Sequence, residues 1–293
     1  MLVLVAGATG NIGQKILASL IRHGHQARAL GRNPDKLPSR LHAQLESFVT
    51  STSYYDIPAL DAACRGVDAV ICAYNGTPEL QVEGHMLLLR ATERAGVRVF
   101  VPASWTAGWQ NMRLGQQESY DPFIMLRRQI EISSDIRPSW IITGILAEVL
   151  FSAPGRVSFT PAFHGSWDGP GRRVEVWGDP AVKWQWTTEG DAADGGWWTV
   201  ASGQHSLVEL AETYGKVRGC DMKIEQMGSV EELRERARAA RAEGKPNAFW
   251  YYIGYYYILF MVDGTYHRAD LDNDRLGIKG TCLEKFLQDY PEV

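Results

Sequence analysis

The sequence predicts an α/β protein built on a doubly wound parallel sheet, with a smaller, mostly C-terminal substrate-binding region. Residues 2–6, LVLVA, form a short aliphatic run that is typical of a strand buried on both faces. The glycine-rich turn GATGNIG follows directly, and a helical pattern of apolar residues begins within it. Apolar runs then alternate with helical patterns as far as residue 150, which predicts parallel strands joined by crossover helices.

The elements of this first part follow in order along the chain. After the first strand and its helix, strands are predicted at residues 26–30, 45–48, 68–74, 97–101 and 140–145. Longer helices are predicted at residues 80–95, closed by Gly96, and at residues 122–133. We therefore expect residues 1–151 to form a nucleotide-binding domain.

The composition changes in the second part. Residues 152–191 are rich in Gly, Pro and Trp and contain only one convincing strand, at 173–177. Helices are predicted at residues 207–217, 230–242 and 281–289. The aromatic run 249–262 is too short, at fourteen residues, for the about 20 needed to span a bilayer, so we interpret it as a buried or interface helix. Residues 152–293 are expected to be the substrate-binding region, with segments returning to the sheet.

The glycine-rich turn predicts a site for a phosphate group. Gly7 suits the tight turn, Gly10 allows a phosphate to approach bare backbone, and Gly13 allows the helix to pack closely. The N-terminus of the helix adds unpaired N–H groups and a positive dipole. Because strand, turn and helix follow in the order of the Rossmann-type fingerprint, the expected cofactor contacts are Gly7, Thr9, Gly10, Asn11, Ile12 and Gly13.

The end of the second strand indicates which dinucleotide binds. NAD-selective proteins usually carry an acidic residue there, but this strand leads into Arg32, and Lys36 follows. A guanidinium at this place pairs with the 2′-phosphate of NADP(H), and Lys36 adds a second charge. A solvated charge pair is the alternative interpretation. We expect NADP(H) as the cofactor.

GATGNIG resembles the turn of the NmrA-like and isoflavone-reductase-like family of atypical short-chain dehydrogenases. The resemblance extends over nearly the whole chain, to the closing Leu-Glu-x-Phe-Leu pattern near residue 285. It implies that Asp56 lies near the adenine, for which a helix N-cap is the rival interpretation. Ala73 and Tyr74, at the end of a strand, are expected over the cofactor. Ser104 corresponds to the serine that ends a strand beside the nicotinamide in the family.

One feature of the family is absent. Its reductases commonly carry a lysine about four residues before a basic pair, and that position is Phe123 here, ahead of Arg127 and Arg128. No lysine lies between Lys36 and Lys183, and the chain has no YxxxK motif. Another acid is therefore expected, or the proton comes from water or substrate, or redox turnover has been lost.

Three side chains are candidates for catalysis. Tyr120 is the first choice as the acid, with a surface tyrosine as its alternative. Ser104 is expected to place a hydroxyl near the nicotinamide or the substrate carbonyl. His164, in a glycine-flanked loop, is a candidate acid or base, with a surface group as its alternative. Aromatic side chains are expected to line the substrate pocket, with core packing as the alternative; the candidates are Trp105, Trp109, Phe123, Trp167 and Trp250.

The composition excludes several classes of function. The chain has 293 residues, 45% of them hydrophobic and 22% charged, and a net charge of −4, so it has no electrostatic footprint for nucleic acid. Its four cysteines form no metal-ligand cluster, and no metal site is expected. The chain has no basic leader before the first strand and no predicted membrane span, and its thiols are expected to be reduced. We therefore expect a cytoplasmic protein that is either a monomer or a homodimer.

The glycine-rich turn and the aromatic loops therefore favour an NADPH-dependent reductase of a hydrophobic aromatic or polycyclic small molecule. We expect this reaction to belong to secondary metabolism. Two alternatives stay open. One is an NADP(H)-sensing regulatory protein without turnover, which the missing lysine favours. The other is a non-redox isomerase, cyclase or lyase on the same scaffold.

Overall fold

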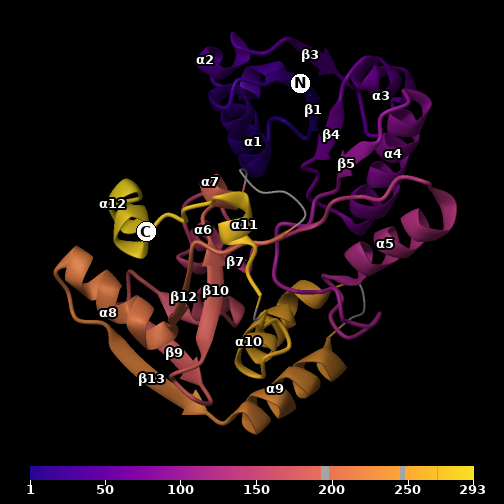
Figure 1. The fold of residues 1–293 in the computed structure, drawn as a ribbon. Coiled ribbons are helices and arrows are strands. Elements are labelled where there is room, and N and C mark those ends of the chain that lie inside the picture. Colours follow the sequence, from indigo (N-terminus) through magenta and orange to yellow (C-terminus); the bar gives the residue numbers. More distant parts are fainter. Residues whose placement is uncertain (193–197, 245–247, 269) are drawn as a thin grey trace. The chain divides into compact units, whose positions relative to one another are not determined.

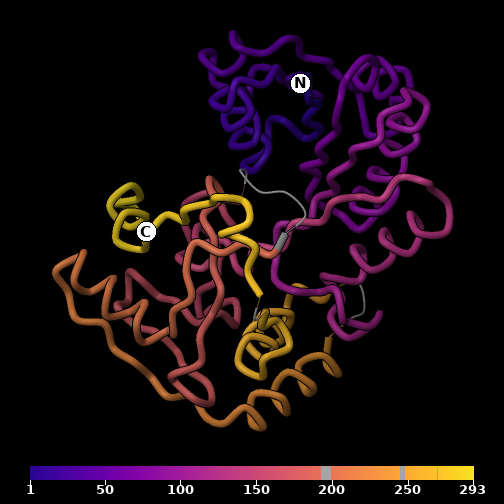
Figure 2. The backbone as a smooth tube through the Cα atoms, viewed as in Figure 1, coloured from indigo at the N-terminus to yellow at the C-terminus, as the bar shows by residue number. Residues whose placement is uncertain are grey.

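A computed structural model describes residues 1–192, 198–244, 248–268 and 270–293. The chain forms two compact units. Unit 1 comprises Met1–Ser104, Asp121–Ile141 and Ala192–Trp198, and unit 2 comprises Trp105–Tyr120, Ile142–Asp191 and Thr199–Val293. The expected division between residues 151 and 152 therefore differs from the observed one, because the chain already enters unit 2 after Ser104. Figure 2 traces this path from the N-terminus in unit 1 to the C-terminus in unit 2.

Unit 1 has the predicted doubly wound parallel sheet. Its five strands lie in the order β3-β2-β1-β4-β5 (Figure 1). They are β1 (Leu2–Ala6), β2 (Gln26–Gly31), β3 (Ser47–Thr50), β4 (Ala69–Cys72) and β5 (Val99–Val101). Each pair is parallel. Leu4, Val5 and Ala6 of the central β1 are completely buried, as a strand covered on both faces requires.

The helices of unit 1 cover both faces of the sheet. α1 (Asn11–Arg22) packs against β1 and β2, whereas α3 (Ile57–Cys64) and α4 (His85–Arg94) pack side by side on the other face (Figure 1). The predicted helix at 80–95 begins as a π-helical turn, η2 (Leu80–Gly84), that leads into α4. α5 (Asp121–Ser133) lies against η2 and α4. Two short pieces, η1 (Pro34–Lys36) and α2 (Ser39–His42), follow β2.

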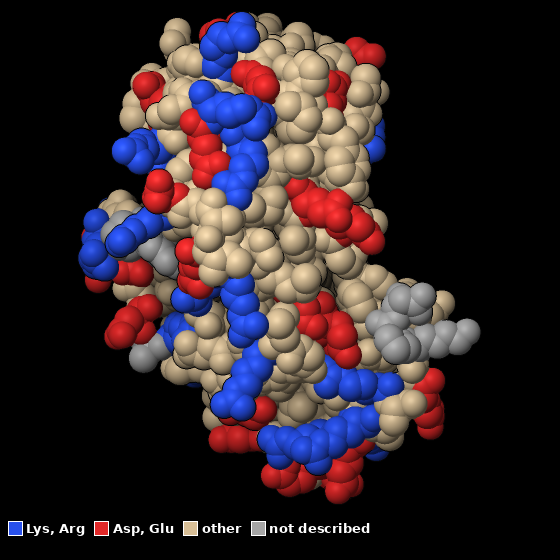
Figure 3. All heavy atoms as spheres, turned by 90° about the vertical axis from the view of Figure 1, so that its right-hand side faces the viewer, with Lys and Arg blue, Asp and Glu red and all other residues tan. Residues whose placement is uncertain are grey.

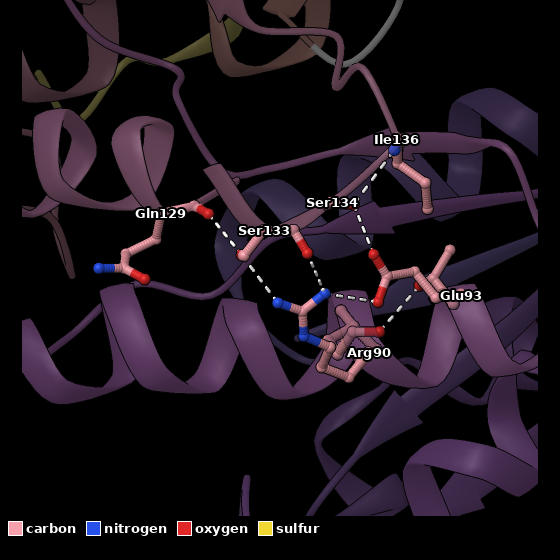
Figure 4. A network of polar contacts seen from close by, with 8 residues as sticks. Arg90, Glu93, Gln129, Ser133, Ser134 and Ile136 are labelled. Atoms are coloured by element: carbon pink, nitrogen blue, oxygen red, sulfur yellow. Dashed lines mark hydrogen bonds and ion pairs between the residues drawn. The ribbon is translucent and has the colours of Figure 1, made fainter. Parts of the chain in front are cut away.

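A network of polar contacts fixes α5 on α4. The Arg90 guanidinium donates to the Ser133 carbonyl at 2.8 Å and to Oε2 of Glu93 at 2.7 Å (Figure 4). The Ser134 hydroxyl donates to the other carboxylate oxygen of Glu93 at 2.5 Å. These charge-assisted bonds hold the C-terminal end of α5 and thereby set the position of the helix that carries Phe123.

The prediction of one continuous strand at residues 140–145 is wrong. The structure has two short pieces, β6 (Ile141–Ile142) and β7 (Ile145–Leu146). Gly144 between them has φ +71°, and a Cβ there would lie 2.2 Å from the carbonyl oxygen of Gln185. The backbone therefore turns where the apolar pattern suggested a continuous strand. β6 pairs with β11 (Trp198–Thr199).

Unit 2 contains two three-stranded sheets. β7 and β12 (Gly203–Ser206) flank β10 (Lys183–Thr187), and β8 (Trp167–Asp168) and β13 (Lys223–Gly228) flank β9 (Arg173–Trp177). The prediction of a single strand in residues 152–191 missed β10. In its sequence KWQWT both tryptophans are fully buried, and antiparallel pairing with β12 stabilises the strand.

The helices of unit 2 follow the prediction closely. They include α8 (Leu207–Arg218), α9 (Val230–Glu243), α10 (Ile253–Val262) and α12 (Leu283–Asp289). The aromatic run forms η4 (Phe249–Tyr251) and then α10, most of which is buried. Shorter pieces are α6 (Ala147–Leu150), η3 (Pro161–Phe163), α7 (Glu189–Ala192) and α11 (Asn273–Leu276). Within the described ranges, no helix combines the length and apolar character needed to cross a bilayer.

Candidate functional site

The glycine-rich turn joins β1 to α1 in unit 1. Gly7 has φ +79°, a left-handed conformation that favours glycine. A Cβ on Gly7 would lie 2.7 Å from the Ala73 carbonyl oxygen, so the turn packs directly against the end of β4. A Cβ on Gly13 would lie 2.3 Å from the carbonyl oxygen of Gly7. Both glycines therefore allow α1 to begin close to the sheet, as predicted.

The N-terminus of α1 can accept an anion. Gly10 is its N-cap, and no side chain caps the first turn. The first turn also contains no acidic residue. Gly10 and Asn11 are exposed, and Thr9 and Ile12 are half-buried. N–H groups at a helix start without a protein acceptor, together with the helix dipole, form an anion-binding site. The uncapped turn therefore fits the pyrophosphate group of a dinucleotide.

Arg32 lies next to this turn. It directly follows Gly31, the last residue of β2, and a Cβ on Gly31 would lie 3.4 Å from the Thr9 side chain. Arg32 and Lys36 are exposed, and within the described ranges neither forms a hydrogen bond or an ion pair with an acidic side chain. Two cations beside an anion-binding turn fit a phosphate on the adenosine ribose.

Asp56 is a helix cap in this structure. Its carboxylate accepts from the Ala59 N–H at 3.3 Å, at the start of α3, and from the Thr52 N–H and hydroxyl, each at 2.9 Å. The bonds from Thr52 and then that from Ala59 lower the pKa of Asp56 below its ordinary value. The N-cap interpretation is therefore confirmed, and the contact with adenine stays a prediction.

The ends of β4 and β5 meet around a buried histidine. The His85 ring lies edge-on to Tyr74, with 5.7 Å between centroids, and its Nε2 accepts from the Ala103 N–H at 3.2 Å. Nδ1 lies 3.4 Å from the Leu80 carbonyl oxygen, so the proton belongs on Nδ1. His85 thus holds the segment Pro102–Ala103–Ser104. Sequence analysis missed it, because a histidine within an apolar helix pattern carries no signal of the loop it contacts.

Ser104 is 1% exposed, and its hydroxyl is bonded within unit 1. The Ile141 N–H donates to Oγ at 2.8 Å, and Oγ donates to the Pro102 carbonyl at 3.4 Å. The hydroxyl therefore fixes the exit of the chain from β5. Phe123, at the position of the family lysine, is half-buried in the first turn of α5.

Tyr120 belongs to unit 2 and is 3% exposed, which excludes the surface alternative. Its hydroxyl shares a hydrogen bond with the Thr106 hydroxyl. The ring lies between those of Tyr257 and Tyr266, with centroid distances of 5.8 and 5.7 Å. Burial raises the pKa of the Tyr120 phenol well above its usual value.

Further polar residues surround Tyr120. The Tyr257 hydroxyl donates to Ser119 at 2.9 Å, Gln117 donates to the same oxygen at 3.1 Å, and Tyr266 donates to Gln117. Gln117 and Ser119 are buried, although both are polar residues in a polar stretch of the sequence. The segment that contains Gln117 and Ser119 is buried because α10 and Tyr266 pack over it. The local sequence pattern does not indicate such a contact.

The remaining candidates lie in different environments. His164 has φ +60°, and its ring stacks on Tyr255 with 4.1 Å between centroids. Trp105 is half-buried, whereas Trp250 is 61% exposed. Trp109 and Trp167 are each 1% exposed, and Trp167 packs between Phe151 and Tyr214. The expectation that Trp109 and Trp167 line an open pocket is therefore corrected to core packing.

Acidification is expected to lower the free energy of unfolding of the parent protein more than that of the His85→Gln variant. Burial lowers the pKa of His85 to about 4 from 6.5. Between these values the unfolded chain binds a proton that the folded chain does not, so stability is full above pH 6.5 and falls as the pH approaches 4. The shift corresponds to roughly 3 kcal/mol at most. Urea unfolding across this range measures it; parallel pH profiles of the two proteins would contradict the assignment, because glutamine stays neutral.

Comparisons with known proteins agree with this geometry. Residues 7–126 match the NAD(P)H-binding family model. A bifunctional pinoresinol-lariciresinol reductase from Linum usitatissimum is 26% identical, over 99% of this chain and 94% of its own. The crystal structure of an isoflavone reductase has a TM-score of 0.75 at 18% identity, covering 99% of both chains. AtPrR2 with NADP+ and (+)pinoresinol has a TM-score of 0.72 at 19% identity, covering 98% of both.

Proposed function

We propose that this chain, an NAD(P)H-binding relative of the pinoresinol-lariciresinol reductases with the fold of isoflavone reductase, is an NADPH-dependent reductase of a hydrophobic aromatic small molecule. The observation that carries the proposal is the uncapped start of α1 beside Arg32 and Lys36, a turn built for a phosphorylated dinucleotide. The names of the relatives support an aromatic substrate and a place in secondary metabolism.

The residues of unit 1 bind and orient the cofactor. The turn from Gly7 to Gly13 holds the pyrophosphate, and Arg32 with Lys36 selects the 2′-phosphate. Ala73 and Tyr74 follow β4 at the carboxyl edge of the sheet, where dinucleotides lie in such folds. When bound, NADPH supplies a hydride to an electrophilic carbon of the substrate. Positioning of the nicotinamide against the substrate provides most of the rate enhancement.

The protein's own hydroxyls position the site, and water or the substrate supplies the proton. Tyr120 and Ser104 are buried, and each hydroxyl is engaged in an internal hydrogen bond. A phenol whose pKa is raised by burial is a poor acid unless it contacts the substrate directly. Trp105, Phe123 and Trp250 remain proposed substrate contacts, and His164 remains a candidate acid or base, since each of these residues is at least partly exposed.

Tyr120→Phe is expected to keep kcat within about tenfold of the parent while lowering stability by about 0.5–1.5 kcal/mol, the net contribution of one hydrogen bond, because the half-buried Thr106 hydroxyl loses its partner. The assay follows loss of NADPH absorbance with pinoresinol and other phenolic substrates, and urea unfolding gives the stability. A loss of kcat of about a thousandfold with unchanged stability would instead identify Tyr120 as the general acid. Turnover by the parent establishes the reductase.

A regulatory role without turnover is the second candidate. Phe123 favours it, because an apolar ring occupies the position of the family lysine and α5 contains no lysine. If the protein binds NADPH tightly but oxidises it with none of the aromatic substrates tested, this candidate replaces the reductase. Conversion of a substrate without net loss of NADPH would point instead to a non-redox reaction on the same scaffold.

A further inference from the structure

His85 joins the ends of two neighbouring strands of unit 1. β4 and β5 are parallel, and Tyr74 and Ser104 follow their carboxyl ends at the same edge of the sheet. His85 lies at the start of α4 and contacts both strand ends. Its ring meets the Tyr74 ring edge-on, and its Nε2 accepts from the Ala103 N–H at 3.2 Å. One buried side chain therefore sets the spacing between the two segments.

Tyr74 extends these contacts to the glycine-rich turn. A Cβ on Gly7 would lie 3.2 Å from Cδ1 of the Tyr74 ring. Contacts thus run from the turn that fits the pyrophosphate, through Tyr74 and His85, to Ala103. All four residues belong to unit 1, and they follow the carboxyl edge of β1, β4 and β5, where a dinucleotide lies in such sheets.

The imidazole of His85 is suited to hold neighbours in place and not to transfer a proton. It is 1% exposed, and burial lowers the pKa of His85 to about 4, so the ring is neutral near pH 7. Its Nδ1 faces the Leu80 carbonyl oxygen at 3.4 Å, in the π-helical turn η2. Such turns are frequent at functional sites. Both ring nitrogens are therefore engaged by the backbone, one by Leu80 and one by Ala103.

Charged side chains of α4 lie at the surface and are paired. Arg94 is exposed and pairs with Asp61, and Arg90 pairs with Glu93. Figure 3 shows basic and acidic side chains next to each other on the side of the molecule where Figure 1 labels α4 and α5. Burial, and not a charged neighbour, is the largest cause of the lowered pKa of His85.

We propose that His85 is a positioning residue for the nicotinamide half of the cofactor. By fixing the segment 102–104 relative to Tyr74, it fixes the surface on which the nicotinamide ring rests. This inference rests on the proposed function. The adenosine half does not depend on His85, because Arg32 follows β2, which β1 separates from β4.

His85→Leu tests this role, because leucine fills the space but does not accept from the Ala103 N–H. The fluorescence anisotropy of protein-bound NADPH, excited in its nicotinamide band, should fall as the ring becomes more mobile. Affinity for adenosine 2′,5′-bisphosphate, which has no nicotinamide, should equal that of the parent. With pinoresinol, kcat should fall by up to about a hundredfold, the effect of a misplaced reacting group. His85→Gln should restore most of both signals, because its Oε1 reaches the place of Nε2.

Thr92→Val is the matched control. Thr92 is fully buried in the same helix, and its hydroxyl donates to the Leu88 carbonyl at 2.8 Å. This variant removes a buried hydrogen bond from α4 away from the strand ends, so anisotropy and kcat should equal those of the parent. Urea unfolding checks that each variant is folded.

The proposal is overturned by parent-like anisotropy in His85→Leu, by equal losses in His85→Leu and Thr92→Val, or by no recovery in His85→Gln. A parent protein that binds neither NADPH nor adenosine 2′,5′-bisphosphate refutes the cofactor assignment and this inference with it. A parent protein that binds NADPH but reduces no substrate refutes the reductase alone, since the anisotropy still decides the role of His85.

Discussion

Gly13→Ala is expected to weaken NADPH binding by at least about a hundredfold. The added Cβ would lie 2.3 Å from the Gly7 carbonyl oxygen and 3.0 Å from the Cα of Ala8. Both are backbone atoms, so no side-chain rotation relieves the clash, and α1 must move away from the turn. Overpacking of this kind costs about 3 kcal/mol, and the displaced N–H groups no longer converge on the phosphate. Titration of the protein with NADPH, followed by tryptophan fluorescence, measures the loss.

Gly190→Ala is the matched control. Gly190 lies in α7, and a Cβ there meets nothing closer than 3.7 Å. Alanine is favoured over glycine in a helix by about 1 kcal/mol, so this variant should bind NADPH like the parent. Circular dichroism checks that both variants fold. Parent-like affinity of Gly13→Ala would show that the close approach of α1 to the turn is not needed for the cofactor.

Arg32→Ala is expected to remove most of the preference for NADPH over NADH. A guanidinium on a phosphate contributes about 1.5–3 kcal/mol, so NADPH affinity should fall by about ten- to a hundredfold. NADH affinity should change little, because that nucleotide has no 2′-phosphate. Paired titrations of parent and variant with both nucleotides measure the discrimination. Lys36→Ala should have a smaller effect, since an ammonium acts there only as a point charge.

Arg40→Ala controls for the loss of one positive charge. Arg40 is exposed in the neighbouring α2 and is not expected to contact the cofactor. Equal losses in Arg32→Ala and Arg40→Ala would mean that only general electrostatic attraction is measured. Binding of neither nucleotide by the parent would refute the cofactor assignment itself and turn attention to the aromatic region.

The sequence was most informative about the cofactor half of the site. Gly7, Gly10 and Gly13 follow a buried strand at a fixed spacing, and this local pattern was sufficient to predict the turn that the structure contains. Arg32 was predicted as a phosphate contact because it directly follows the second strand. Asp56 shows the limit of such reasoning, because a cap and a ligand contact use the same carboxylate and only the bonds to Thr52 and Ala59 identify the cap.

The substrate half was harder to predict, for a physical reason. An aromatic residue in a loop pattern has the same local signal whether it faces a ligand or the core. Trp167 packs on Phe151 and Tyr214, which are distant in sequence, whereas Trp250 remains largely exposed. For Tyr120 the sequence left a surface position open, yet Tyr257 and Tyr266, more than a hundred residues away, pack against it.

The sequence by itself determined the parallel sheet, the glycine turn and the charged end of β2, because each depends on residues that are neighbours along the chain. Only the tertiary structure decided that His85 holds the end of β5 and that Ser104 and Tyr120 bond internally. These features depend on which distant segments pack together. Burial then fixes whether a hydroxyl, a ring or a guanidinium is free to meet a ligand.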